Sequence, residues 1–158
     1  MTEQDERFMR RAIALAQQGI DEGAGGPFGA IIVKDDEAIG EGYNQVTSTN
    51  DPTAHAEVVA IRNACRNLNS FQLDGCVLYT SCEPCPMCLG AIYWARPARV
   101  FYAATREDAA KVGFDDQFIY EEIEKNFEQR RMKLVNVLRD EGLRVFENWT
   151  NKTDKTKY

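Results

Sequence analysis

A single histidine constrains the fold of this 158-residue chain more than any other feature. His55 lies two residues before Glu57, and twenty-six residues separate Glu57 from the segment Pro84-Cys85-Pro86-Met87-Cys88. Imidazole nitrogen and cysteine sulfur are ligands that zinc prefers in proteins. If His55, Cys85 and Cys88 bind one ion, the fold must bring two distant segments to the same point. The pattern therefore predicts a metal centre where two elements meet.

The residue types in this pattern favour a catalytic zinc site. Such a site keeps three protein ligands and one position for water, and the ion lowers the pKa of that water so that hydroxide forms near neutral pH. Cysteines three apart at the start of a helix lie on one face, where the helix N-terminus favours thiolates. Glu57 is then free to act as a general acid/base that moves protons from the water to the substrate. The pattern H-x-E followed by P-C-x-x-C is typical of zinc-dependent nucleobase deaminases.

A non-catalytic zinc domain, used for binding or structure, stays open as an alternative. Cysteine pairs with this spacing also occur in structural zinc sites and in redox pairs. A closed structural site needs a fourth ligand, which Cys65, Cys76 or Cys82 would have to supply. The coincidence of His55 and Glu57 with the cysteine pair favours the enzyme.

Length and composition predict one compact domain spanning residues 1–158. The chain is 44% hydrophobic and 28% charged, which is ordinary for a globular protein. Residues 1–6 lack the basic and apolar regions of a signal peptide, and no apolar run has the length of a membrane span. Five cysteines, two of them assigned to the metal, favour a reducing setting. We therefore expect a cytoplasmic protein without a membrane partner.

Hydrophobic periodicity predicts alternating helices and strands along the chain. Expected helices cover residues 4–19, 86–95 and 140–149, and another, with Thr53 as its cap, carries His55 and Glu57 on its first turn and runs to about 67. Expected strands cover 30–33, a segment ending near 43, 76–80, 99–103 and 134–138. The order predicts an α/β fold with three α/β/α layers and a mixed five-stranded sheet that includes a right-handed parallel crossover. In such sheets ligands bind beyond the carboxyl ends of the strands, where the two metal-bearing helices begin.

Four segments carry a resemblance to a known family. They are Gly25-Gly26-Pro27-Phe28-Gly29-Ala30, Asn50-Asp51-Pro52-Thr53-Ala54-His55-Ala56-Glu57, the run from Tyr79 to Ala95, and Gly113-Phe114-Asp115-Asp116. Through them the chain resembles the cytidine-deaminase-fold superfamily, and within it the bacterial guanine deaminases. The zinc motif identifies only the superfamily, whereas the Trp94 segment and Phe114-Asp115-Asp116 narrow the resemblance to guanine.

The resemblance implies hydrolysis of the 2-amino group of guanine to give xanthine and ammonia in purine metabolism, with one zinc ion per subunit. It also implies a homodimer in which residues 139–158 of one subunit form a swapped C-terminal helix and lid over the active site of the other.

Carried over to this sequence, the resemblance also implies site residues. Phe28 would stack on the purine, Asn44 would hydrogen-bond its polar edge, and Ala56 would contact the substrate. Trp94 would wall the pocket, and Tyr158 would close it as the swapped lid. Besides Glu57, Asp116 would contact the ring or assist proton transfer, and Glu147, with Glu141 as the alternative, would be a second acidic residue.

The residues by themselves leave other roles open. Phe28 is equally suited to core packing, Trp94 suits core packing first and a pocket wall second, and Asn44 suits a turn. Asp115 and Asp116 suit a solvated turn or a helix cap, although a carboxylate is also the acceptor that guanine N–H groups need. Tyr158 lies in a lysine-rich tail of the kind that frays.

Charge argues against the nearest alternative within the fold, a tRNA adenosine deaminase. Nucleic-acid binding draws most of its affinity from Lys and Arg contacts to phosphate. This chain has a net charge of −6 and a pI near 4.9, and residues 105–130 carry eight acidic against four basic side chains. We therefore expect a small-molecule purine and no nucleic acid as partner. Cytosine and nucleoside deaminases stay open, because pocket shape decides between those substrates.

Overall fold

The computed structural model describes residues 2–157. The chain divides into two compact units, Met1–Asp116 and Gln117–Tyr158. The first unit contains α1 (Glu3–Asp21), β1 (Gly29–Lys34), β2 (Glu37–Tyr43), α2 (Val46–Thr49), α3 (Ala56–Leu68), β3 (Val77–Cys82), α4 (Pro86–Ala95), β4 (Arg99–Ala104) and α5 (Arg106–Lys111). The second contains α6 (Gln117–Glu124), the 3₁₀ turn η1 (Phe127–Gln129) and α7 (Arg139–Asn151). Over the described residues, no helix is both long enough and apolar enough to cross a membrane.

The sheet of the first unit has four strands in the order β2-β1-β3-β4. Strand β1 is antiparallel to β2 and β3, and β4 is parallel to β3. Asp35 and Asp36 make the β1–β2 turn with φ of 48° and 64°, a left-handed conformation that a short polar side chain tolerates. The predicted hairpin and the predicted parallel pairing across α4 are both confirmed.

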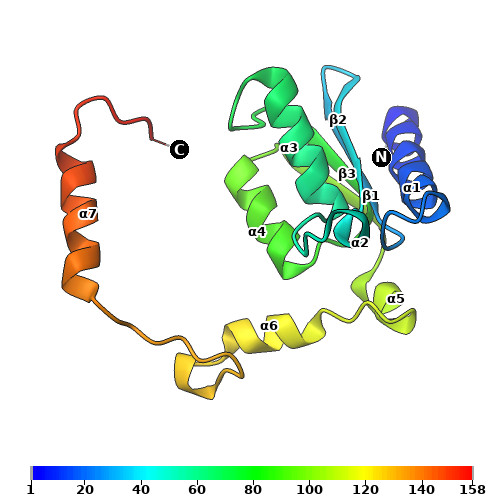
Figure 1. Ribbon diagram of the computed structural model, residues 1–158. Helices are drawn as coiled ribbons and strands as arrows, with labels where there is room; N and C mark the ends of the chain where they lie inside the picture. Colours follow the sequence, from blue (N-terminus) through cyan, green and yellow to red (C-terminus); the bar gives the residue numbers. More distant parts are fainter. Residues whose placement is uncertain (1, 158) are drawn as a thin grey trace. The chain divides into compact units, whose positions relative to one another are not determined.

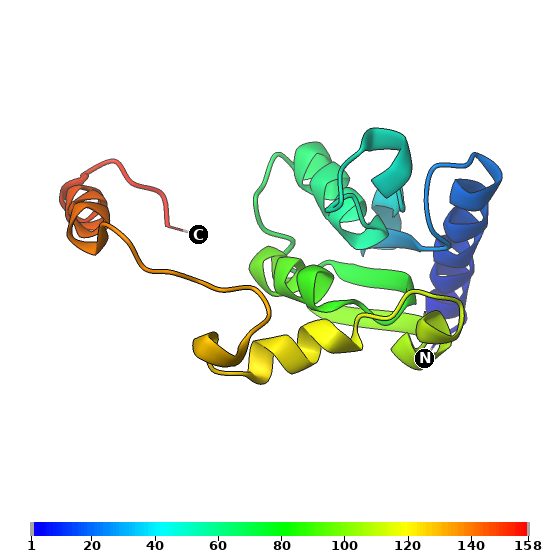
Figure 2. The ribbon, with the colours of Figure 1, turned by 60° about the horizontal axis from the view of Figure 1, so that its bottom comes forward.

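Alternation along β1 divides the apolar side chains of the first unit into two cores. Ile31 and Val33 pack with Phe8 and Leu15 of α1 on one face of the sheet. Ile32, on the opposite face, belongs to a second core. That core also contains Ala56, Ala60 and Ala64 of α3, Leu78 of β3, and Ile92 and Ala95 of α4. Figures 1 and 2 show α1 on one side of the sheet and α3 and α4 on the other, so this unit has the predicted three layers.

The predicted fifth strand is wrong. Residues 134–138 form neither helix nor strand, and Val135 and Val137 are more than 70% exposed. The β-branched, alternating pattern reports only that a segment would suit a pleated, half-buried surface. The described part of the second unit contains no strand with which this segment could pair, and a lone strand has no partner for its backbone hydrogen bonds. The fold is therefore α/β with a mixed four-stranded sheet.

The start of α3 also differs from the prediction. The helix begins at Ala56 with His55 as its N-cap residue, so Glu57 lies on the first turn but His55 does not. Thr53 caps no helix, because it lies two residues before the N-cap position. Its N–H and its hydroxyl both donate to Asp51 Oδ1, at 2.8 and 2.6 Å. His55 has extended backbone angles, φ −71° and ψ 154°, so it lies just ahead of the helix.

The second unit leaves most of its apolar side chains in contact with solvent. On α7, Leu143, Phe146 and Trp149 recur every three residues, a spacing that places them on one side of a helix. All three are exposed, and so are Leu134 and Leu138 just before the helix. The described residues of this unit therefore contain no buried core of their own.

Candidate metal centre and active site

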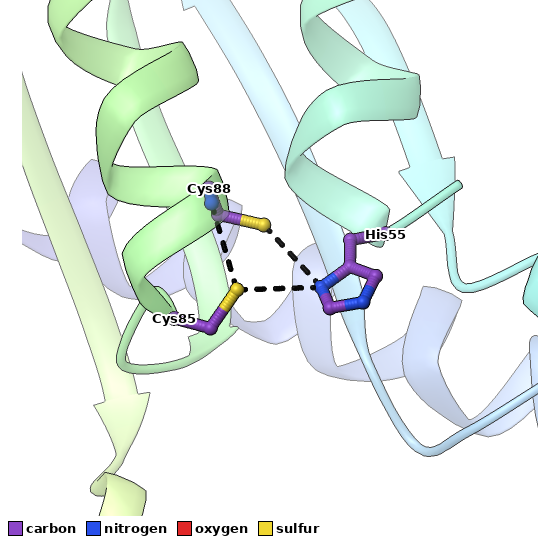
Figure 3. A group of neighbouring side chains, drawn as sticks. All are labelled: His55, Cys85 and Cys88. Atoms are coloured by element: carbon purple, nitrogen blue, oxygen red, sulfur yellow. Dashed lines mark hydrogen bonds between the residues drawn. The ribbon is translucent and has the colours of Figure 1, made fainter. Parts of the chain in front are cut away.

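Three side chains from two helix starts converge on one point in the first unit. His55 is the N-cap residue of α3, Cys85 is the N-cap residue of α4, and Cys88 follows on the first turn of α4. The Nδ1 atom of His55 lies 3.5 Å from the Sγ atoms of both cysteines, as Figure 3 shows. The three ligand atoms all lie within 4.8 Å of one another. The arrangement is the one that the sequence predicts.

The spacing fits a tetrahedral zinc ion. Zinc bonds of about 2.3 Å to sulfur and 2.0–2.1 Å to nitrogen place a sulfur and a nitrogen about 3.6 Å apart around the ion, and the observed separation is 3.5 Å. Among the described residues, no fourth side chain joins this group. Cys82 Sγ instead contacts the carbonyl of Thr105 at 3.5 Å. Three ligands and an open position are the features of a catalytic site, so the donor set does not favour the closed structural site.

Hydrogen bonds among the three ligands favour the thiolate form of Cys85. The Cys88 side chain lowers the pKa of Cys85 to about 4, and His55 and the Cys88 backbone N–H act in the same direction. The hydrogen bond with Cys85 raises the pKa of His55. The hydrogen bond with Cys85 and burial together raise the pKa of Cys88. Thiolate sulfur is the form that binds zinc, and binding releases the protons that the other ligands hold.

Glu57 lies beside the three ligands without joining them. Its Oε1 accepts a hydrogen bond from Thr80 Oγ1 at 3.3 Å, and Cys88 Sγ lies 3.3 Å from its Oε2. The side chain is buried, and burial raises the pKa of its carboxyl group. A carboxyl group with a raised pKa next to an activated water is suited to exchange protons near neutral pH.

A cavity of about 660 Å³ opens onto the metal ligands. Its size is suited to a small planar ligand. Six of the predicted site residues line it: Phe28, Asn44, His55, Glu57, Cys85 and Asp116. Burial raises the pKa of Asp116, and Ala56 lies buried at the start of α3. One cavity therefore collects the polar and aromatic groups that the sequence distributes over about ninety residues.

The cavity also has lining residues to which the sequence analysis assigned no role. Phe114 meets Phe28 edge to face, with ring centroids 5.0 Å apart. Cys82 also lines the cavity, together with Glu83 and Arg106. The glycine-rich segment around Phe28 and the Gly113-Phe114-Asp115-Asp116 segment were the signals that could have identified Phe114. Nothing in the sequence marks Arg106.

Asn44 is held firmly at the cavity wall. Its side chain is buried, and its Oδ1 accepts hydrogen bonds from the backbone N–H groups of Gly26 and Val46, both at 3.2 Å. Its own backbone N–H donates to the carbonyl of Phe28 at 2.9 Å. Asn44 therefore both stabilises a turn, as the sequence left open, and lines the cavity.

Besides Cys88 and Ala56, which are buried at the starts of α4 and α3, three predicted residues are not among those that line this cavity. Trp94 lies on α4 with 66% of its surface exposed, so the core-packing alternative for it is wrong. Glu147 lies on α7 in the second unit, where it is exposed. Tyr158 lies outside the described residues. Their roles at the site remain predictions.

Comparison with protein families identifies the group to which this fold and metal centre belong. Residues 2–104 match the cytidine and deoxycytidylate deaminase zinc-binding region. The matched range includes α1 to β4 and all three metal ligands. The chain belongs to this zinc-binding deaminase family. Zinc is therefore the ion for which His55, Cys85 and Cys88 form the site.

Individual members of the family are similar over nearly the whole chain. Guanine deaminase from Bacillus subtilis is 60% identical over 153 residues, which are 97% of this chain and 98% of that protein. An X-ray structure of guanine deaminase from Bacillus subtilis matches with a TM-score of 0.95 and 58% identity, covering 100% of this chain and 99% of the other. A tRNA-specific adenosine deaminase from Buchnera aphidicola is 35% identical over 146 residues, which are 92% of this chain and 93% of that protein.

Proposed function

We propose that this protein is a guanine deaminase, which hydrolyses the 2-amino group of guanine to give xanthine and ammonia in purine metabolism. The observation that carries the proposal is the buried Glu57 carboxyl group, which lies beside three zinc ligands and lines a cavity large enough for a purine. The 60% identical guanine deaminase from Bacillus subtilis supports guanine as the substrate.

The mechanism divides the work between the ion and Glu57. When bound, zinc supplies an activated water molecule near neutral pH. Glu57 accepts a proton at Oε2, the oxygen nearer Cys88, while Thr80 holds Oε1. It passes this proton to the ring nitrogen, then takes the second proton of the added water and passes it to the departing amine. One water molecule is consumed for each ammonia released, so no further reactant is needed.

The remaining cavity residues would bind and orient the purine. Phe28, braced by Phe114, offers an aromatic face for stacking. Asn44 meets the polar edge of the base, and Ala56 contacts the substrate from the start of α3. Asp116, on the cavity wall, contacts the ring or assists proton transfer.

Residues near the C-terminus would complete the site. Glu147 is the proposed second acidic residue, with Glu141 as the alternative. We propose a homodimer in which residues 139–158 of one subunit cover the cavity of the other, with Tyr158 as the lid and Trp94 as a wall. The apolar side of α7 supports this proposal, because its own unit leaves Phe146 and Trp149 uncovered.

The composition of α4 also supports a dimer. The helix contains no charged residue, and a helix that is apolar all round is normally covered on every side. The sheet covers one side through Ile92 and Ala95. Tyr93 and Trp94 are 76% and 66% exposed, so a second subunit would remove a large aromatic surface from water.

A cytoplasmic location is part of the proposal. All five cysteines are free, and the two at the metal site need reduced sulfur.

A substrate panel tests the proposed function. The zinc-loaded protein is incubated with guanine, guanosine, adenine, cytosine or a tRNA anticodon stem, and ammonia release is followed. We expect turnover of guanine alone. Turnover of the RNA alone would replace the proposal with tRNA deamination, the activity named for the Buchnera relative, despite the net charge of −6.

Two substitutions separate the mechanism from a zinc domain that only binds or supports structure. Glu57→Ala is expected to keep zinc and fold but to abolish ammonia release. Cys88→Ala is expected to lose zinc as well, because one thiolate and one imidazole remain. Metal content by atomic absorption and the unfolding temperature serve as the two controls. Wild-type turnover by the Glu57 variant would remove the proposed mechanism.

A further inference from the structure

A second cavity lies between α3 and the segment that connects β2 to it, residues 45–54. Its volume is about 330 Å³, at the lower end of the range for small-molecule sites. It shares no lining residue with the cavity at the metal ligands. Its polar lining comes from the connecting segment and from α3: Gln45, Thr49, Asp51, Arg62, Asn63 and Arg66.

The charged side chains of this second cavity favour an anion. Arg62 and Arg66 lie four residues apart on α3, a spacing that places them on the same side of the helix. Asp51 is the one carboxylate among the described lining residues. Two guanidinium groups against one carboxylate leave an excess of one positive charge, in a chain whose net charge is −6.

The single carboxylate leaves most of the guanidinium donors available. Asp51 Oδ1 already accepts from the N–H and the hydroxyl of Thr53. Its Oδ2 lies 3.7 Å from Arg62 Nη1, which is longer than the roughly 2.7–2.9 Å of a charge-assisted hydrogen bond. No carboxylate among the described residues forms an ion pair with Arg66. An oxyanion between the two arginines would therefore relieve their mutual repulsion and add hydrogen bonds.

Amide groups beside the arginines complete a site for phosphate. Asn63 Nδ2 donates one of its two N–H groups to the carbonyl of Glu41 at 2.8 Å, which leaves the other for a ligand. Gln45 supplies a second amide from the connecting segment. The fork of a guanidinium group matches phosphate geometry, and a phosphomonoester presents three oxygen atoms to these donors. The cavity also has room for a small organic group beyond the phosphate.

We propose that the second cavity is a binding site for a small phosphomonoester, held by Arg62 and Arg66, and that its ligand acts on the metal-site cavity through residues 45–54. The site goes beyond the proposed function, because binding there requires no deamination.

The connecting segment contributes to both cavities. Val46 and Thr47 line the cavity at the metal ligands, whereas Gln45 lines the second one. The backbone N–H of Gln45 donates to the carbonyl of Ala54 at 2.9 Å, and Ala54 directly precedes the metal ligand His55. A ligand that joins Gln45 to the arginines of α3 restrains this segment, so it also restrains one wall of the metal-site cavity. Binding at the two cavities is then coupled, and the coupling is reciprocal.

Calorimetry with the zinc-loaded protein and ribose 5-phosphate tests the site. This probe carries a phosphomonoester but no purine. We expect saturable binding with a Kd of about 1 mM or tighter, and at least about 10-fold weaker binding by Arg66→Gln, which loses the unpaired guanidinium group. Arg10→Gln is the matched control, because it removes the same charge from α1 at a residue that lines neither cavity. Equal weakening in both variants, or no saturable binding by the wild type, would overturn the site.

Asp51→Asn tests the same site with the opposite sign. The substitution removes the carboxylate that competes for Arg62 and keeps an oxygen that can accept from Thr53. We expect ribose 5-phosphate to bind about 3-fold more tightly or better. Weaker binding by this variant would show that the ligand does not use Arg62, and would overturn the assignment.

Inorganic phosphate distinguishes the two sources of the same chemistry. Tighter binding of ribose 5-phosphate than of inorganic phosphate would assign the cavity to the ester, since the organic group then adds contacts. Equal binding of both, with the same loss in Arg66→Gln, would confirm the phosphate site and overturn the assignment to an ester.

The coupling to the metal-site cavity has a test of its own, which rests on the proposed function. Saturating ribose 5-phosphate is expected to lower the KM for guanine about 5-fold in the wild type and to leave it unchanged in Arg66→Gln. An unchanged KM in the wild type would overturn the coupling. If the protein did not turn over guanine at all, the calorimetric results would still decide whether the site exists.

Discussion

The two compact units of the chain differ in where their apolar side chains lie. In Met1–Asp116, Ile31, Ile32 and Leu78 are completely buried between a sheet and the helices on its two faces. In the second unit, Val135, Val137 and Phe146 are about 70% exposed or more. A segment of this kind cannot offset its loss of conformational entropy by burial of its own surface. The first unit therefore buries an apolar core of its own, whereas the described residues of the second unit bury none.

The largest expected effect, on kcat, tests whether the catalytic residues lie in the first unit. Glu57→Gln removes the proton acceptor and keeps the shape, so we expect kcat to fall about 10³-fold. Glu147→Gln, on α7 of the second unit, is expected to cost about 10-fold, because we assign it only an assisting role. Steady-state kinetics with zinc content as control gives both numbers. A greater fall in kcat for Glu147→Gln than for Glu57→Gln would show that the main proton-transfer residue lies in the second unit.

Core substitutions sharpen the same comparison in terms of stability. Ile32→Ala creates a cavity between the sheet and α3, and we expect it to lower the free energy of unfolding by about 2–5 kcal/mol. Val137→Ala changes an exposed side chain and should cost less than about 0.5 kcal/mol. Urea unfolding at low protein concentration compares the two. A cost above 2 kcal/mol for Val137→Ala would mean that the second unit is covered even in dilute solution.

Substitutions on the exposed side of α4 test whether a second copy of the chain covers this surface. Combining Tyr93→Ser with Trp94→Ser removes two large apolar side chains, which we expect to weaken dimerisation at least about 30-fold. Light scattering coupled to size-exclusion chromatography measures the effect. Ile13→Ser on α1, where the side chain is 47% exposed, provides the control and should leave the mass unchanged. A monomeric wild-type protein at every concentration would contradict the proposed dimer.

The smallest expected effect is a pH-dependent change in stability from the hydrogen bonds that link α1 to the sheet. Asp5 accepts hydrogen bonds from the Tyr79 hydroxyl and from the Thr2 backbone N–H, both at 2.7 Å, and these bonds lower the pKa of its carboxyl group. Because the folded pKa lies below the unfolded one, the stabilisation is present above the unfolded value of about 3.9 and is lost as pH falls through the folded pKa.

Asp5→Asn should therefore lower the unfolding temperature by a few degrees at neutral pH, and the difference should shrink below about pH 4. Thermal unfolding followed by circular dichroism over this pH range measures it. Tyr79→Phe removes the donor and serves as the control, because it should reduce the same pH dependence. A constant difference between the wild type and Asp5→Asn at all pH values would show that the hydrogen bond does not cause it.

The features that local chemistry decides could be predicted from the sequence. The metal ligands were found because zinc needs particular atoms at particular spacings, and β1 because Ala30 to Val33 form an apolar run bounded by turn residues. The fifth strand could not be judged in this way, since the pattern of Leu134 to Leu138 contains no information about a pairing partner. The predicted start of α3 was wrong because the residue type shows only that Thr53 could cap a helix, whereas the turn at Pro52 and Thr53 is followed by a helix whose N-cap residue is His55.

Side-chain orientation was also beyond the sequence. The residue type shows that Asn44 can both donate and accept, and only the folded loop shows that its oxygen is already occupied. The same holds for Thr80, whose contact with Glu57 depends on how β3 lies against α3. A linear pattern identifies which atoms are present, while their availability to a substrate depends on neighbours brought together by folding.

The positions of the metal ligands have a consequence for the lifetime of the protein in a cell. His55 and Cys85 begin two different helices, so an ion bound between them joins α3 to α4 as a cross-link would. Metal affinity of this kind adds to the free energy of folding. Zinc shortage would then increase local opening at these helix starts and expose the chain to proteases, so that enzyme abundance, as well as activity, would follow the supply of the ion.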